Sequence, residues 1–343
     1  MKAMALRGIT DIFLNREPLA CVQLPVPEPA GDQLLLRVLT CGVCHTDIDE
    51  IEGRTPPATI PMVPGHQVVG IVEKTGPGMA RFRKGDRVGV GWIYSACGEC
   101  RFCRGGAENL CDQFKATGRD ADGGYAEYMV VSERFAYPIP GSFSDSEAAP
   151  LLCAGAIGYR ALTLASMRDG DSLGLVGFGA SGHIVLRLVR HLYPRSRIYV
   201  FSRTETERSF ARELGASWAG DFDDHCPEKL QCAIDTTPAW GPVVSGLKNL
   251  EKGGRLVINA IRKEEKDKQA LLSLDYPRDL WMEKEVKSVA NITRQDVATF
   301  LELAAEVNIR PVVEEYSLEE ANRALCELKD RRIRGAKVLR ISH

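Results

Sequence analysis

Short apolar runs separated by glycine and proline dominate the first 150 residues of the chain. Three of them read QLLLRVLTCG (33–42), HQVVGIVEKTG (66–76) and KGDRVGVGW (84–92). Apolar and β-branched runs of this length, bounded by turn residues, are typical of β-strands. We therefore expect a β-rich N-terminal domain.

The pattern changes further along the chain, where apolar strands alternate with amphipathic helices. Residues 171–193 read strand, tight turn and helix, and residues 197–216 repeat this order. Two more short apolar strands are expected at 231–237 and 253–260. Alternation of strands with helices predicts a parallel sheet with helices on its faces.

The C-terminal part returns to a different pattern. Residues 295–307 have helical periodicity, and residues 316–342 are expected to form a helix, a turn and a closing strand. This order predicts a β-rich domain at 1–153, an inserted α/β domain at 154–291, and a return to the first domain at 292–343.

Composition and charge narrow the function classes. The 343 residues include 44 Lys and Arg against 46 Asp and Glu, a formal net charge of −2. This balance, with no long basic run, argues against a nucleic-acid-binding surface. The N-terminal stretch lacks the apolar region of a signal peptide, and no segment approaches the roughly 18 apolar residues of a membrane span. We expect a cytoplasmic protein without a membrane partner, whose eleven cysteines are metal ligands, catalytic groups or buried apolar residues.

Four cysteines with the spacing C-x2-C-x2-C-x7-C form the densest cluster: Cys97, Cys100, Cys103 and Cys111. Such short spacers let four thiolates surround one zinc ion tetrahedrally. Because all four ligands are cysteine, no position remains for water or substrate, which predicts a structural zinc site. An iron–sulfur motif would continue with C-x3-C-P, which this sequence lacks. A nucleic-acid zinc ribbon is disfavoured, because it would need paired knuckles and a basic face. Four unligated thiols in one loop are also disfavoured, because such thiols would oxidise.

Cys44, His66 and Cys153 lie in three separate segments, each beside small residues. Two thiolates and one imidazole make a three-ligand zinc set with the fourth position open, as in catalytic zinc sites. Taken singly, a cysteine is more often a small buried apolar residue, and a histidine a core or turn residue. The three residues by themselves leave both interpretations open.

The segment LGLVGFGASG (173–182) has the pattern G-x-G-x-x-G after an apolar strand and at the start of a helix. A dinucleotide-binding fingerprint requires this context, because the pyrophosphate lies at the helix N-terminus. The alternative is an ordinary glycine-rich turn. The candidate coenzyme-binding residues are Gly177, Gly179, Ala180, Ser181 and Gly182.

The next strand ends at Ser202, where an NAD-binding protein normally has Asp or Glu to hold the adenosine ribose hydroxyls. Here Ser202 and Arg203 offer a hydroxyl and a guanidinium, which suit the 2′-phosphate of NADP. We expect NADP(H) to be preferred over NAD(H), with Glu205 and Glu207 in the same loop opposing that preference. The alternative is that Arg203 is a solvated surface residue.

Several motifs resemble those of the zinc-dependent medium-chain alcohol dehydrogenases in order and spacing: CGVCHTD, PGHQVVG, the four-cysteine loop and GGYAEY. The resemblance covers essentially the whole chain, and the segments DADGGYAEYMVV and PLLCAGAIGYRAL are similar to a bacterial branch of zinc-binding alcohol dehydrogenases. It implies a GroES-like β-rich catalytic domain and a Rossmann domain with a doubly wound parallel sheet. It also implies two zinc ions per chain: a catalytic ion on Cys44, His66 and Cys153, and a structural ion in the four-cysteine loop.

The same resemblance assigns further roles. It aligns Thr46 with the hydroxyl that takes the alcohol proton, Asp47 with a carboxylate that orients the ligating histidine, and His45 with a position near the coenzyme pyrophosphate. Two positions depart from the family pattern. Gln67 stands where the family has Glu, which removes one negative charge, and Asp49 stands where the proton relay often ends in histidine.

The activity that the resemblance implies is that of an alcohol dehydrogenase or aldehyde reductase, which transfers hydride between an alcohol and a nicotinamide coenzyme. It also implies a homodimer or homotetramer. A zinc-free quinone reductase of the same fold is disfavoured, because that class lacks both cysteine sets. The other alternative is a non-catalytic zinc- and nucleotide-binding protein, which the intact ligand set and Thr46 disfavour.

Overall fold

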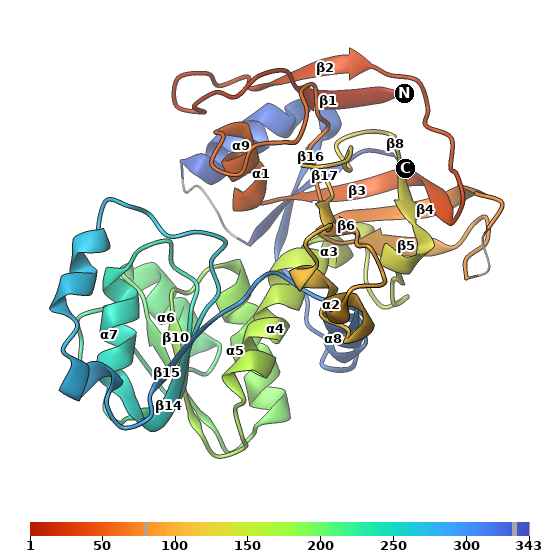
Figure 1. Cartoon of the computed structure of the whole chain (residues 1–343). Helices are drawn as coiled ribbons and strands as arrows, with labels where there is room; N and C mark the ends of the chain where they lie inside the picture. The colour runs from red at the N-terminus through yellow and green to blue at the C-terminus, as the bar shows by residue number, and fades with distance from the viewer. Residues whose placement is uncertain (79–80, 331–334, 343) are drawn as a thin grey trace. The chain divides into compact units, whose positions relative to one another are not determined.

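The computed structural model describes residues 1–78, 81–330 and 335–342. The chain forms two compact units, Met1–Cys153 with Ile292–His343 and Ala154–Asn291. The first unit is therefore built from both ends of the chain, and the second is inserted between them, as the colours of Figure 1 show.

The first unit is rich in β-strands. Its strands are β1 (Lys2–Leu6), β2 (Leu19–Gln23), β3 (Gln33–Val43), β4 (Val68–Thr75), β5 (Arg87–Val90), β6 (Ile93–Ser95), β7 (Lys115–Ala116), β8 (Tyr128–Ser132), β9 (Ala136–Pro138), β16 (Val313–Ser317) and β17 (Ala336–Arg340). The main sheet has the order β16-β17-β3-β4-β5-β9, and β8 also pairs with β3. All its pairings are antiparallel except that of β16 with β17.

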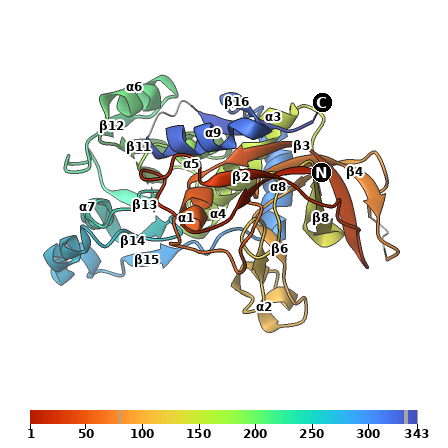
Figure 2. The ribbon, with the colours of Figure 1, turned by 90° about the horizontal axis from the view of Figure 1, so that it is seen from above.

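Helices and helical turns of the first unit connect these strands. They are α1 (His45–Ile51), α2 (Arg101–Arg104), η1 (Glu108–Leu110), η2 (Glu133–Phe135), α3 (Asp145–Pro150), η3 (Leu151–Gly155, which runs into the second unit), α8 (Arg294–Glu306), η6 (Leu318–Glu320) and α9 (Ala321–Lys329). Figure 2 shows the lobe that contains β6 and α2 projecting from the sheet.

Strand β3 lies at the centre of the first unit and explains how its segments meet. Its eleven residues are almost all buried, because both faces of the strand are covered. It pairs with β4, β8 and β17, so the middle and the C-terminal end of the chain join one sheet. The register pairs Cys41 with Val68, which places the C-terminal end of β3 beside the start of β4.

The second unit contains a parallel sheet. Its strands are β10 (Ser172–Val176), β11 (Arg197–Phe201), β12 (Trp218–Gly220), β13 (Leu230–Asp235), β14 (Leu250–Ile258) and β15 (Glu285–Ser288). Its helices and helical turns are α4 (Ala156–Ala165), α5 (Ala180–Leu192), α6 (Glu205–Glu213), α7 (Gly241–Asn249), η4 (Lys268–Ser273) and η5 (Tyr276–Leu280). Figures 1 and 2 show α4 and α5 on one side of the strands and α7 on the other.

The strand order of the second unit is that of a Rossmann domain. The sheet runs β12-β11-β10-β13-β14-β15, and every neighbouring pair is parallel. Chain order reverses between β10 and β13, and ligands of such sheets bind outside the carboxyl ends of the strands at this point. The predicted fold class, a GroES-like β-rich domain with a Rossmann domain, is confirmed.

One helical stretch differs from the sequence-based expectation. Residues Asp145–Ala165 form 21 continuous helical residues, long and apolar enough by length and composition to cross a membrane, whereas no such segment was expected. Within the described residues, 61% of its apolar window is buried inside the protein. This burial is that of a core helix, whose apolar side chains are already covered by protein. The turn expected before the closing strand falls at 331–334, outside the described residues.

Candidate active site

Three side chains from distant segments meet in the first unit. Cys44 follows β3 and caps the N-terminus of α1, His66 lies just before β4, and Cys153 lies in the π-helical turn η3. Their ligand atoms all lie within 4.8 Å of one another, and Cys44 Sγ is 3.3 Å from His66 Nε2. The pairing of β3 with β4 brings the first two together, although 22 residues separate them in the chain.

Asp47 supports this cluster from the first turn of α1. Its Oδ2 accepts hydrogen bonds from the Cys44 backbone amide at 2.8 Å and from the Tyr125 hydroxyl at 3.2 Å. Its Oδ1 lies 3.3 Å from His66 Nδ1, and both side chains are fully buried. The imidazole is thereby turned so that Nε2 faces Cys44. Tyr125 was not predicted from the sequence, because only the folded structure brings the GGYAEY motif to α1.

The electrostatics of the cluster favour a bound cation. The Cys153 thiol, which is hydrogen-bonded to Cys44, together with His66 holds the pKa of Cys44 well below its usual value. Burial lowers the pKa of His66, but the charges of Cys44 and Asp47 outweigh this and raise it well above its usual value. Buried negative charge of this kind is stable only when it is paired or coordinates a metal.

The donor set fits a zinc ion. Zn–S bonds of about 2.3 Å and Zn–N bonds of about 2.0 Å at a tetrahedral angle separate the two donor atoms by about 3.5 Å. The observed 3.3 Å between Cys44 Sγ and His66 Nε2 is close to this value. Three donors leave the fourth corner of the tetrahedron open, which is the arrangement of catalytic zinc sites.

The four-cysteine loop forms a second cluster around α2 and η1. Its four Sγ atoms lie within 4.8 Å of one another, with Cys97 Sγ 3.8 Å from Cys103 Sγ and 3.5 Å from Cys111 Sγ. Tetrahedral zinc with bonds of about 2.3 Å would separate its thiolates by about 3.8 Å. Backbone amides of Glu99 and Cys100 lower the pKa of Cys97 to about 6, which favours the thiolate. The cluster therefore fits a closed, four-thiolate zinc site.

The residues after Cys44 occupy different environments. Thr46 is half-buried and its amide donates to Cys44 Sγ at 3.4 Å, whereas His45 is exposed. Asp49 is 6% exposed and pairs with Arg54, so its carboxylate is already held by a cation. Gln67, which stands where the family has Glu, is buried.

Glu50 is a buried carboxylate that the sequence analysis did not single out. It is 1% exposed, and neither of its oxygens has a hydrogen-bond partner among the described residues. Burial and the nearby charge of Asp47 raise the pKa of Glu50 well above its usual value. The spacing from Asp47 to Glu50, three residues on one helix, places both on the same face of α1 and was the signal available in the sequence.

The glycine fingerprint forms the turn between β10 and α5. Gly177 has φ +88°, and a Cβ there would lie 2.6 Å from Thr236 Oγ1, so this position requires glycine. Gly179 precedes the helix and is exposed with Ala180, while Gly182 packs against the turn. The Ser181 hydroxyl donates to the carbonyl of Ala154 at 3.0 Å and is thus occupied. The backbone amides at this helix start remain suited to a pyrophosphate.

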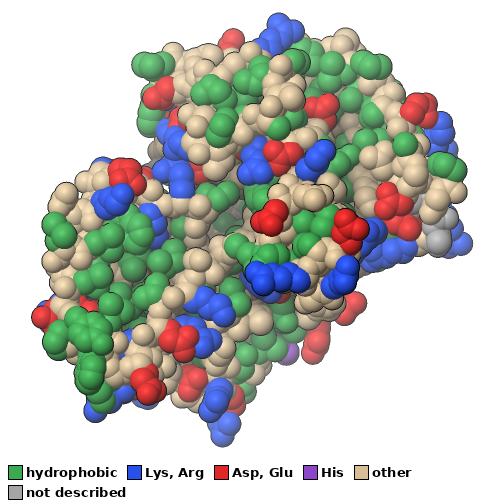
Figure 3. Space-filling model, in the orientation of Figure 1, with side chains coloured by type: hydrophobic (Ala, Val, Ile, Leu, Met, Phe, Trp, Pro, Cys, Tyr) green, Lys and Arg blue, Asp and Glu red, His purple; other side chains and the backbone are tan. Residues whose placement is uncertain are grey.

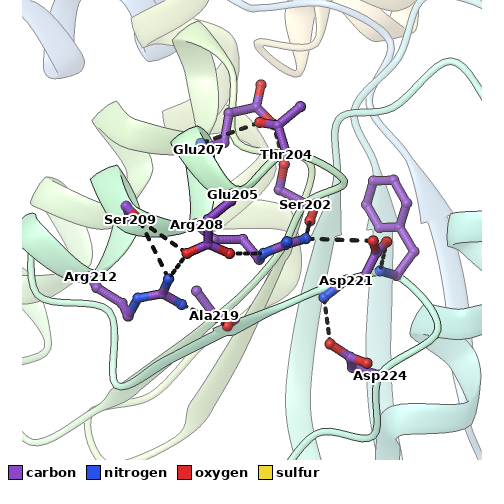
Figure 4. A network of polar contacts seen from close by, with 11 residues as sticks. Ser202, Thr204, Glu205, Glu207, Arg208, Ser209, Arg212, Ala219, Asp221 and Asp224 are labelled. Atoms are coloured by element: carbon purple, nitrogen blue, oxygen red, sulfur yellow. Dashed lines mark hydrogen bonds and ion pairs between the residues drawn. The ribbon is translucent and has the colours of Figure 1, made fainter.

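The end of β11 is more crowded than the sequence indicated (Figure 4). Ser202 is 1% exposed, and its hydroxyl donates to the carboxylate of Glu207, so it is not free. Arg208 Nη1 donates to the Ser202 carbonyl at 2.7 Å. Arg203 is exposed beside them. Arg203 was predicted from the sequence, whereas Arg208 was not, because its contact with Ser202 depends on one turn of α6.

Known proteins resemble this chain over nearly its whole length. The alcohol dehydrogenase GroES-like domain matches residues 30–141. A probable alcohol dehydrogenase AdhA of Mycobacterium tuberculosis (strain CDC 1551 / Oshkosh) is 42% identical over 96% of this chain and 94% of its own. An alcohol dehydrogenase of Geobacillus stearothermophilus is 30% identical over 95% and 97% of the two chains. The cobalt- and zinc-bound thermostable alcohol dehydrogenase of Pyrobaculum aerophilum is 26% identical, with a TM-score of 0.86 over 100% of this chain and 99% of its own.

Proposed function

This chain belongs to the zinc-type medium-chain alcohol dehydrogenase family, and we propose on that basis that it is a zinc-dependent alcohol dehydrogenase or aldehyde reductase. It would transfer hydride between a small alcohol and a nicotinamide coenzyme. The observation that carries this proposal is the convergence of Cys44, His66 and Cys153 on one point, with donors for three of the four positions of a zinc ion.

Each residue of this site has a distinct task in the proposed reaction. When bound, zinc would supply the Lewis acidity that acidifies an alcohol hydroxyl or polarises a carbonyl. Cys44, His66 and Cys153 hold the ion, and Asp47 fixes the imidazole orientation. The Thr46 hydroxyl, two residues from Cys44 and half-buried, accepts the alcohol proton. Asp49 is the next acceptor, and its carboxylate forms an ion pair with Arg54.

The four-cysteine loop has a structural role in this proposal. Its ion would have four thiolate ligands and no open position, so it would stabilise the projecting lobe and take no part in hydride transfer. We therefore propose two zinc ions per chain.

The coenzyme in this proposal is NADP(H), with NAD(H) as the weaker ligand. Its pyrophosphate would lie at the turn Gly177–Gly182. The position after β11 carries Ser202 in place of the carboxylate that binds NAD. Arg203 is exposed there and suits the 2′-phosphate. Loss of this contact in Arg203→Ala should reduce the ratio of kcat/KM for NADP over NAD by about tenfold.

We propose a homodimer or homotetramer that acts in the cytoplasm. Strand β15 is at the edge of its sheet, and all four of its residues are exposed. Five large apolar side chains in this strand and the segment before it are exposed: Leu272, Tyr276, Trp281, Met282 and Val286. Figure 3 shows apolar side chains gathered at the lower left of the view. An exposed edge and an apolar patch together are typical of a surface that a second copy covers. All eleven cysteines are free of disulfides, in keeping with a reducing compartment.

The test of the proposed function is a substrate panel on the zinc-loaded protein. Primary alcohols would be offered with NADP and with NAD, and formation of the reduced nicotinamide would be followed by absorbance. We expect turnover that disappears in Cys44→Ser and persists in Cys226→Ser, a cysteine outside both clusters. Absence of turnover with any alcohol or aldehyde, in protein that binds both zinc and coenzyme, would favour the non-catalytic alternative.

A further inference from the structure

A carboxylate reaches the end of β11 from a helix instead of from the strand itself. Glu207 is the third residue of α6, and its amide is capped by Thr204 Oγ1 at 3.2 Å. The Glu207 carboxylate accepts a hydrogen bond from the hydroxyl of Ser202, the buried residue that follows β11 (Figure 4). The chain thus has a carboxylate beside the position where NAD-binding proteins have theirs, although the residue at that position is serine.

The charges of Glu205 and Arg208 at this strand end are already paired. Glu205 accepts from Arg208 Nε at 2.9 Å and also pairs with Arg212. Arg208 in turn lies 3.5 Å from Asp221 and donates to the Ser202 carbonyl, so its cation is shared among several oxygens. Among the described residues, Glu207 forms no ion pair, and its Oε1 takes no part in the bond to Ser202. Its charge is therefore available to a ligand.

Two opposed groups consequently flank the same strand end. The hydroxyls of an adenosine ribose donate well to a carboxylate, whereas a 2′-phosphate is repelled by it. Arg203 is exposed on the adjoining loop, and its guanidinium favours the 2′-phosphate over the free ribose hydroxyls. We propose that Glu207 is a specificity-determining residue for the coenzyme: it binds the ribose hydroxyls of NAD(H), opposes the 2′-phosphate of NADP(H), and so limits the selectivity that Arg203 provides. This inference rests on the proposed coenzyme function.

Direct binding of adenosine nucleotides tests the inference without catalysis. The probes are 5′-AMP, which carries the free ribose hydroxyls, and 2′,5′-ADP, which carries the 2′-phosphate. Their dissociation constants would be measured by calorimetry for the wild type, Glu207→Gln and Glu213→Gln. The last variant removes the same charge from the far end of α6, where the side chain is exposed.

We expect Glu207→Gln to weaken the binding of 5′-AMP and to strengthen the binding of 2′,5′-ADP. The ratio of the two dissociation constants should therefore shift by about tenfold or more. Glu213→Gln should leave the ratio unchanged. Glu207→Asp keeps the charge but shortens the side chain, so it should weaken the binding of 5′-AMP and still disfavour the binding of 2′,5′-ADP. This variant replaces Glu207→Gln in the test if Glu207→Gln does not fold.

Two failures of this experiment have different meanings. An unchanged ratio in Glu207→Gln, or an equal shift in Glu213→Gln, would overturn the inference alone and leave Glu207 as a residue that only stabilises the start of α6. Failure of the wild-type protein to bind either nucleotide would overturn both the inference and the proposed coenzyme function.

Discussion

The Asp47 carboxylate lies 3.3 Å from Nδ1 of His66, and both side chains are fully buried. The other oxygen of this carboxylate accepts a hydrogen bond from the backbone amide of Cys44. Asp47 therefore contacts both Cys44 and His66. Two of the three proposed zinc donors are thus positioned by a single residue of α1. Such contacts fix the tautomer and the direction of a ligating histidine.

Replacement of Asp47 by Asn should weaken zinc binding at the cluster of Cys44, His66 and Cys153 by about 10–100-fold, because the amide lacks the charge that holds the imidazole. Competition with a chromophoric chelator measures this affinity. The exposed Asp223→Asn variant makes the same charge change elsewhere and should bind zinc as the wild type does. Equal affinity in Asp47→Asn would refute this positioning role.

Replacement of Cys103 by Ser should lower stability much more than activity per folded molecule, because the four-cysteine site has no open position. Loss of a structural metal is one of the changes that lower the free energy of unfolding most, here by about 3–5 kcal/mol. Metal analysis should find one zinc ion in place of two, and thermal unfolding should shift to lower temperature. The matched Cys226→Ser variant should keep both ions. If Cys103→Ser instead abolished turnover in fully folded protein, the structural assignment would be wrong.

Replacement of Thr46 by Val removes the proposed proton acceptor while keeping the shape of the side chain. The rate of alcohol oxidation should fall by about 10²–10⁴-fold, the usual contribution of a positioned proton acceptor. Thr46→Ser retains the hydroxyl and should remain within a few-fold of the wild type. Steady-state kinetics with one good alcohol distinguishes the two. A valine variant with most of the wild-type rate would mean that the proton leaves directly to water.

Stability should depend on pH through a buried network around Lys337. Its side chain is 1% exposed, and its Nζ lies 2.8 Å from Glu314 and 2.8 Å from Glu327. The hydrogen bond from Lys337 holds the pKa of Glu327 below its ordinary value of 4.5. A carboxyl with a lowered folded-state pKa stabilises the fold above the unfolded-state pKa, and this contribution is lost as pH falls through the folded-state pKa.

The Glu327→Gln variant should therefore be less stable than the wild type by about 1–3 kcal/mol at neutral pH, with a difference that shrinks below about pH 4.5. Glu314 still pairs with Lys337, so the variant should fold. Urea unfolding at a series of pH values measures the difference. The exposed Glu302→Gln variant is the control and should match the wild type throughout. A difference that stays constant at low pH would contradict the ionic origin of the effect.

Much of this architecture could be predicted from the sequence because its signals are local. The spacing of Cys97, Cys100, Cys103 and Cys111 restricts the four sulfurs to one short loop, whatever the rest of the chain does. The glycine fingerprint likewise depends on a single strand–turn–helix unit, in which Gly177 needs a positive φ. The alternation of strands and helices predicted the parallel sheet, and the family resemblance identified the fold class, which is confirmed.

Other features depended on contacts between residues far apart in the chain. Edge strand β15 and the long helix Asp145–Ala165 were not predicted, because their boundaries depend on which surfaces the rest of the unit covers. From the sequence alone, the Ser202 hydroxyl was expected to be available to the coenzyme. In the structure it donates a hydrogen bond to Glu207, which lies in the first turn of α6.

The sequence by itself determined which residue types are present and the short-range geometry of the cysteine loop and the glycine turn. Only the tertiary structure decided that Cys44, His66 and Cys153 meet, that Asp47 lies against the imidazole, and that Glu50 is buried with no hydrogen-bond partner in the described part of the chain. The physical reason is that backbone geometry limits neighbours in the chain directly, whereas distant side chains meet through strand register and helix packing, which the whole fold determines.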